Sequence, residues 1–352
     1  MYEVIVNPNK KVADTGELLV GLGDSTVDNK GIALQHKTQT VYYESLSQYV
    51  YSTEFKNLNA PQCCQQIFIE DFSVDTILSL WIFLHKKLDQ VLPENVINWV
   101  NYASKWEKGD TTTTGKAFES YGCLQNALVL SMKNYSASEI VTESLDFLST
   151  LIRQNIDPAT ISKLTNNSTY GQAYESLEKE YKKYQALLSD NETAKLHIPQ
   201  IQSNEPKEVS GIFIETEIIS SIQKVFLRND IENSPTRNGF AFMAVYNTKA
   251  KGTGNDIVIS VDPLKKVHLK ALWKALEEEE NSLWEEIRPK DNPRPLKSYP
   301  DHNGPNEPWW DDMGKYTLIA APKMVYGQYG RRVSWERVKQ LIKQLYAKGA
   351  QS

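Results

Sequence analysis

The segment Ile67–Leu88, with the sequence IFIEDFSVDTILSLWIFLHKKL, decides the fold class of this chain. It opens with a short apolar run that ends in Glu70 and Asp71, a pattern typical of a buried strand in a parallel sheet. From Val74 onward the apolar residues recur at helical spacing and predict a helix. A strand, a turn and a helix in this order form half of a βαβ unit, so we expect a parallel sheet whose strand ends can bind ligands.

Residues upstream of this segment complete an N-terminal α/β lobe. Short strands are predicted at Glu3–Val6, Leu18–Val20 and Ile32–Leu34, where β-formers precede turn residues such as Asn, Pro and Gly. Apolar residues of Val41–Tyr51 follow a helical spacing instead.

The middle of the chain, from Val96 to about Asp190, reads as mostly helical. Its clearest predicted helices are Leu124–Met132, Ser138–Asn155 and Gly171–Ser189. The following stretch, Pro199–Glu208, is rich in Ser, Asn, Pro and Lys, and we interpret it as a linker between domains.

Strand patterns dominate after this stretch. The predicted strands are Gly211–Ile214, Phe240–Tyr246, Asp256–Val261 and Tyr316–Ala320, with a hairpin turn at Asn247–Asn255 and helices at Leu264–Arg288 and Ser334–Ala347. We therefore predict an α/β protein with three parts: a parallel-sheet lobe with a helical extension (1–198), a linker (199–208) and a smaller C-terminal α/β lobe (209–352).

Composition narrows the function class. The 352 residues carry a formal net charge of −5, which argues against coating nucleic acid by bulk electrostatics. No apolar run approaches the roughly 20 residues that span a bilayer, and no secretory signal opens the chain, so we expect a cytoplasmic protein without a membrane partner. The three cysteines are too few for a disulfide framework.

Three acidic clusters follow predicted strands or turns in the first third of the chain. They are Asp24 and Asp28, with His36 after them; Glu70, Asp71 and Asp75; and Glu107 and Asp110. Carboxylates that converge at the rim of a parallel sheet suit Mg²⁺ or Mn²⁺, and Mn²⁺ also accepts histidine. A purely structural alternative is that Asp71 or Ser73 caps the following helix.

Three parts of the chain resemble motifs of the DHH phosphoesterase superfamily. Glu17–Asp28 (ELLVGLGDSTVD), followed by Ile32–His36 (IALQH), resembles its strand-and-DHH stretch, and the match is closest to the melanocyte-proliferating-gene branch of metal-dependent exonucleases. Ile69–Leu80 resembles the family's other metal-binding strand end. Val325–Arg337 (VYGQYGRRVSWER) resembles the Gly-rich basic turn of its second domain.

This resemblance implies a divalent-metal-dependent phosphoesterase or nuclease-like protein that acts on a nucleotide or short nucleic acid. His36 and Asp75 would match family ligands, while Asp24, Asp28 and Asp71 would be nearby substitutes. In this interpretation Asp24, His36, Asp71 and Asp75 would hold Mn²⁺ or Mg²⁺, and Asp71 and Asp75 would serve catalysis. However, Gly21 stands where the family has an aspartate, and Leu34-Gln35-His36 replaces Asp-His-His. The alternative is a non-catalytic binding or assembly module, with a protein partner or a second copy of the chain, on a scaffold that has lost its metal ligands.

The C-terminal turn offers a phosphate site. Gly327 and Gly330 let backbone approach a ligand, and Arg331 and Arg332 carry planar donors suited to phosphate. In the alternative interpretation the glycines only shape a turn before a helix. The nearby Trp309-Trp310 pair either stacks on bases or anchors a long loop to the core.

Overall fold

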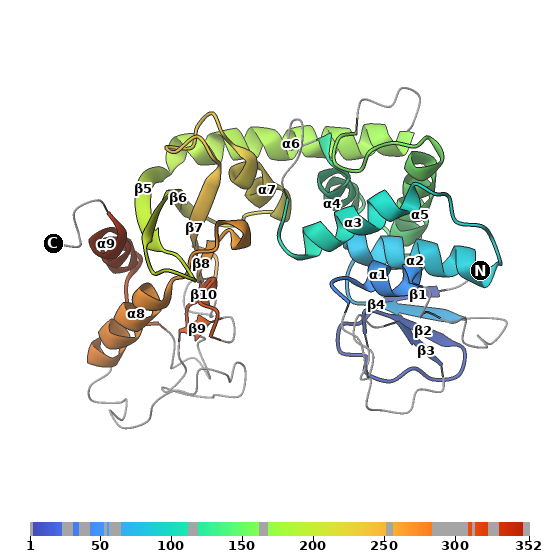
Figure 1. Cartoon of the computed structure of the whole chain (residues 1–352), viewed down its shortest axis with the longest axis horizontal. Helices are drawn as coiled ribbons and strands as arrows, with labels where there is room; N and C mark the ends of the chain where they lie inside the picture. The colour runs from blue at the N-terminus through green and yellow to red at the C-terminus, as the bar shows by residue number, and fades with distance from the viewer. Residues whose placement is uncertain are drawn as a thin grey trace. The chain divides into compact units, whose positions relative to one another are not determined.

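The computed structural model describes residues 3–22, 31–34, 43–52, 55, 65–111, 119–161, 168–250, 256–283, 309–311, 314–322 and 331–347 (Figure 1). The chain forms two compact units, Met1–Tyr181 and Lys182–Ser352. Each unit contains its own sheet, and the chain passes from one to the other within helix α6 (Ser168–Asp190). The predicted α/β class is therefore confirmed.

The first unit contains a parallel sheet. Its strands are β1 (Glu3–Val6), β2 (Glu17–Val20), β3 (Ile32–Leu34) and β4 (Gln66–Ile69), in the order β1-β4-β2-β3, and every neighbouring pair is parallel. Leu18, Leu19 and Val20 are completely buried, as expected for a strand covered on both faces. The strand predicted at the start of the Ile67–Leu88 segment is β4.

Helix α2 (Val74–Lys87) forms the centre of the helical layer in this unit (Figure 1). It contacts its neighbours α1 (Leu46–Tyr51), α3 (Val96–Glu107), α4 (Tyr121–Ser131) and α5 (Ala137–Arg153). All ten residues from Val74 to Phe83 are buried, which is why most of them are apolar. The Ser73 hydroxyl caps its first turn by accepting the N–H of Thr76 at 3.2 Å.

The second unit contains a mixed six-stranded sheet. The strands β5 (Glu192–Pro199), β6 (Pro206–Thr216), β7 (Phe240–Asn247), β8 (Ile257–Val261), β9 (Trp310–Asp311) and β10 (Leu318–Ala320) lie in the order β5-β6-β7-β8-β10-β9. Only β6 and β7 pair in parallel among these strands, and α7 (Ser221–Asn229) connects them, so this part is a complete βαβ unit.

Helices α8 (Lys270–Leu283) and α9 (Trp335–Tyr346) cover one face of this sheet. Alternate residues of β7 and β8, such as Phe242, Ala244 and Ile259, share a core with the apolar stripes of these two helices. The residues between them, such as Met243 and Val245, therefore face the opposite side, where α7 lies. No helix among the described residues is long and apolar enough to cross a membrane.

The segment 199–208, expected as a domain linker, forms the turn of the β5–β6 hairpin. Pro199 pairs with Pro206, and the N–H of Gln200 donates to the carbonyl of Glu205 at 3.0 Å. Turn-forming residues mark a tight hairpin as well as a linker, so composition did not separate the two. The division between the units lies upstream, inside a helix that carries no linker signal.

Candidate functional site

The sequence predicted a metal site from four residues, of which the structure describes two. Asp24 and His36 lie outside the described residues. Asp71 and Asp75 follow the carboxyl end of β4, which is where the sequence pattern put them. The convergence of all four on one cation stays a prediction.

Asp75 is a buried carboxylate that holds another helix in place. Its Oδ2 accepts a hydrogen bond from the N–H of Leu46 at 2.6 Å, and its Oδ1 accepts one from the N–H of Ser47 at 3.0 Å. Those two N–H groups belong to the first turn of α1, where helices have unpaired donors. Both oxygens of Asp75 therefore tie α1 to α2.

Asp71 also accepts hydrogen bonds from nearby groups, at the start of α2. Its Oδ1 accepts hydrogen bonds from the N–H of Ser73 at 2.9 Å and from the hydroxyl of Thr76 at 3.2 Å. A Mg²⁺ or Mn²⁺ ion takes about six ligands, and no group of three or more His, Cys, Asp and Glu side chains is placed to hold a metal in the part of the chain that the structure describes. Asp71 and Asp75 alone provide too few ligands for such an ion.

Glu107, the last residue of α3, links two of the acidic clusters seen in the sequence. Its pKa is raised to about 7, first because the surrounding protein removes water from the carboxyl group and then because Asp75, Asp71 and Glu70 carry like charges nearby. By its accessible surface, however, Glu107 is an exposed residue of α3, so solvent still reaches the carboxyl group. A carboxyl that titrates near neutrality can hold or release a proton at physiological pH.

The side chain of Arg331, predicted to contact phosphate, instead makes hydrogen bonds within the second unit. Its Nε donates to both carboxylate oxygens of Asp256, at 3.1 and 2.9 Å, and its Nη1 donates to the carbonyl of Val333 at 2.5 Å. The guanidinium carbon lies 5.1 Å from the ring centroid of Tyr246. These donors, assigned to a phosphate from the sequence, are thus used within the fold.

The remaining residues of the predicted phosphate turn are only partly described. Gly327 and Gly330 lie outside the described residues, and Arg332 has an exposed side chain. The backbone N–H of Arg332 donates to the buried carboxylate of Glu280, which also accepts the indole N–H of Trp309 at 3.2 Å. Trp309 is completely buried, so it anchors its segment to the core and is not available to stack on bases.

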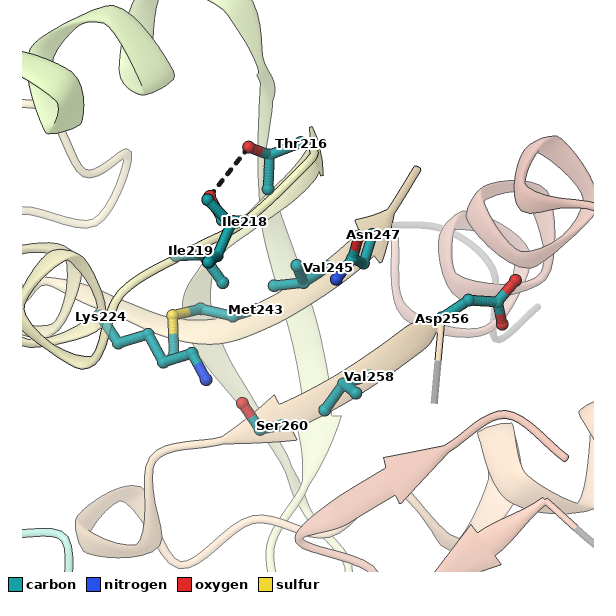
Figure 2. Close-up of a pocket in the computed structure, with 10 residues that line it drawn as sticks. All are labelled: Thr216, Ile218, Ile219, Lys224, Met243, Val245, Asn247, Asp256, Val258 and Ser260. Atoms are coloured by element: carbon teal, nitrogen blue, oxygen red, sulfur yellow. Dashed lines mark hydrogen bonds between the residues drawn. The ribbon is translucent and has the colours of Figure 1, made fainter. Parts of the chain in front are cut away.

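A pocket of about 150 Å³ opens on the α7 side of the second sheet (Figure 2). It lies at the carboxyl ends of the parallel strands β6 and β7, whose last residues, Thr216 and Asn247, both line it. Open α/β sheets bind ligands at such strand ends. The other lining residues come from α7, β8 and the turn after β6: Ile218, Ile219, Lys224, Met243, Val245, Asp256, Val258 and Ser260.

Lys224 brings an ammonium group to this pocket. Figure 2 shows its side chain extending from α7 across the sheet with Nζ on the side of Ser260. Lys224 is an exposed residue by its accessible surface, but partial burial of its ammonium group lowers its pKa, and the positive charge of Arg228 lowers it further. Within the described ranges, no hydrogen bond or ion pair joins Nζ to another residue.

Arg228 lies one helical turn after Lys224, on the same side of α7. Its Nη1 donates to the carbonyl oxygens of Phe240, at 2.9 Å, and Ala241, and its Nη2 lies 3.5 Å from the hydroxyl of Ser260. Burial lowers the pKa of Arg228 to about 10, so it stays charged at neutral pH. Arg228 therefore fastens α7 to the sheet and adds positive charge beside the pocket.

Sequence reasoning missed this pocket because it missed α7. The nine residues Ser221–Asn229 form a short helix, and Lys224 looks like any surface lysine in the sequence. One signal was present: the capping box formed by Ser220 and Gln223 marks the start of a helix.

Comparison with known proteins yields no match to any family model, curated protein or solved structure. The resemblance to the DHH phosphoesterase superfamily therefore stays a prediction from the sequence.

Proposed function

We propose that this protein is a non-catalytic binding module, built on an α/β scaffold, rather than a metal-dependent hydrolase. The observation that carries the proposal is the pairing of both Asp75 oxygens with backbone N–H groups of α1. A carboxylate committed to two buried donors contributes to folding and has less capacity to bind a cation or a substrate. The partner classes inferred from the sequence belong to this proposal: a nucleotide or short nucleic acid, a protein, or a second copy of the chain.

A divalent-metal phosphoesterase is the second candidate, and Glu107 is the observation that favours it. A carboxyl group with a pKa of about 7, beside Asp71 and Asp75, has the protonation behaviour of a general acid or base. Structural carboxylate clusters shift pKa values in the same way, so this feature supports the enzyme less than the Asp75 contacts support the binding module.

A metal titration separates the two candidates. Melting curves of the full chain with increasing Mn²⁺ or Mg²⁺ report metal binding, because a ligand that binds the folded state raises the Tm by mass action. The same samples are assayed for hydrolysis of bis(p-nitrophenyl) phosphate and of a short single-stranded oligonucleotide. For a binding module we expect neither a metal-dependent Tm nor turnover. Turnover that requires metal and is lost in Glu107→Gln, with the fold intact, would establish the hydrolase instead.

A further inference from the structure

The pocket at the carboxyl ends of β6 and β7 presents a positively charged group to a bound molecule. Its two charged lining residues are Lys224 and Asp256. Figure 2 shows the Asp256 carboxylate turned away from the pocket, and that carboxylate is paired with Arg331. Lys224 is therefore the charge that a bound molecule would meet, and Arg228, whose own charge is partly balanced by Asp262, lies next to it.

Partial burial of the charged ammonium group of Lys224 costs free energy, and a bound anion would offset that cost. Its lowered pKa means that its surroundings disfavour the charged form. A carboxylate or phosphate oxygen at Nζ would form a charge-assisted hydrogen bond in a partly desolvated place, where such bonds are strongest. The hydroxyl of Ser260, also in the pocket lining, provides a second hydrogen-bonding group close by.

Apart from Thr216 and Asn247 at the strand ends, the rest of the lining is apolar, and the space is small. Met243, Val245 and Val258 form the surface of the sheet here, with Ile218 and Ile219 at the turn after β6. Pockets for drug-sized ligands and cofactors measure roughly 300–1,000 Å³, whereas this one measures about 150 Å³. A whole nucleotide exceeds that volume, while an aliphatic chain of a few carbons suits it.

The donor inventory favours a single negative charge over two. Arg228 directs Nη1 to two backbone carbonyls and Nη2 toward Ser260, so it is not arranged as a fork for phosphate. One ammonium group balances one carboxylate. Lys224 is the one cationic side chain in the lining that the structure describes, so a phosphate dianion would keep a second negative charge without a direct ionic partner, which is costly.

We propose that this pocket binds a short-chain aliphatic carboxylate, with the carboxylate at Lys224 and the alkyl chain against Met243 and Val245. The site belongs to the second unit and uses none of the acidic residues of the first. The inference therefore goes beyond the proposed binding function, and it does not depend on whether the metal titration shows metal binding.

The experiment uses the full chain labelled with ¹³C in the methionine methyl groups. The sequence has five methionines, and Met243→Leu assigns the signal that reports on the pocket. Butyrate should shift the Met243 signal in a saturable way, with a Kd on the order of millimolar for a ligand of this size. Butyramide, which has the same shape without the charge, should bind at least about tenfold more weakly, the loss of one charge-assisted hydrogen bond. Inorganic phosphate should leave the signal unshifted.

Substitutions at Lys224 test the assignment directly. Lys224→Met keeps an unbranched side chain but removes the charge, and should weaken butyrate at least about tenfold, whereas Lys224→Arg should retain binding. Lys195→Met is the matched control, because it removes the same charge from an exposed lysine of β5 outside the pocket lining. Equal binding of butyrate and butyramide, a stronger response to phosphate, or unchanged affinity in a folded Lys224→Met protein would each overturn the proposal.

Discussion

Arg331 and Asp256, 75 residues apart in the chain, form a buried ion pair in which one guanidinium nitrogen, Nε, donates to both carboxylate oxygens. Their side chains are 9% and 1% exposed, respectively. The pair connects the segment just before α9 to the start of β8. Removing one member of such a pair leaves the other buried without its counter-charge, which costs far more than the loss of a surface contact.

We therefore expect Arg331→Ala to lower the free energy of unfolding by about 3–5 kcal/mol, the range for breaking a buried pair. Arg332→Ala is the matched control, since its side chain is exposed and its link to Glu280 runs through the backbone N–H. This change should cost at most about 1 kcal/mol, as is usual at the surface. Urea unfolding measures both. A stable Arg331→Ala protein that had lost affinity for phosphate-bearing ligands would restore the phosphate role.

The contrast between these two arginines shows how far the sequence alone could lead. Both stand in the same Gly-rich basic turn, and both carry the same donors. Whether a guanidinium faces solvent or a buried carboxylate depends on contacts made across 75 residues, which local pattern does not contain. The same applies to Asp75, whose partners lie 28 and 29 residues upstream.

The elements themselves were more predictable, for a physical reason. Strand β4 and helix α2 are buried over most of their length, so their sequences must be apolar in the matching period. Strand β5 is a sheet edge whose first four residues are exposed or half-buried, and it therefore gave no signal. The hairpin at 199–208 was misassigned because the strand before it was not recognised.

Asp75 provides the second prediction. Asp75→Ala leaves the N–H groups of Leu46 and Ser47 without their acceptor in a buried place, which should cost about 2–4 kcal/mol at roughly 1–3 for each lost partner. Asp71→Ala, at an exposed position, should cost about 1 kcal/mol, as for a lost helix cap. Urea unfolding compares the two variants without added metal. Similar, small losses would mean that Asp75 does not anchor α1.

Glu107 provides a prediction about pH. Its folded-state pKa of about 7 lies above the ordinary value of 4.5, so between these values the folded state binds more protons than the unfolded state. Stability from this group is full below pH 4.5 and is lost as the pH rises through about 7. Glu107→Gln should therefore flatten the fall in stability across this window and melt higher than the parent above pH 7. Melting curves from pH 5 to about 8 test this, and parallel curves for the two proteins would show that Glu107 titrates normally.

The last prediction concerns the turn that leads from α7 into the amino end of β7. Gly239 has a positive φ of 70°, and a Cβ atom there would lie 1.8 Å from the backbone carbonyl oxygen of Arg228. Gly314 also has a positive φ, 83°, but a Cβ atom added to it would meet nothing within 4 Å. The two glycines share one backbone constraint and differ in the space around them.

Gly314→Ala should therefore cost about 1 kcal/mol, the conformational penalty alone. Gly239→Ala should cost about 2–5 kcal/mol, because that penalty is joined by the strain of moving α7 away from β7. The displacement acts on the Arg228 backbone and so on the contacts that Arg228 makes with Phe240 and Ala241. Urea unfolding of both variants measures the difference. Equal losses would mean that the α7–β7 turn relaxes around the new methyl group and does not hold Arg228 in place.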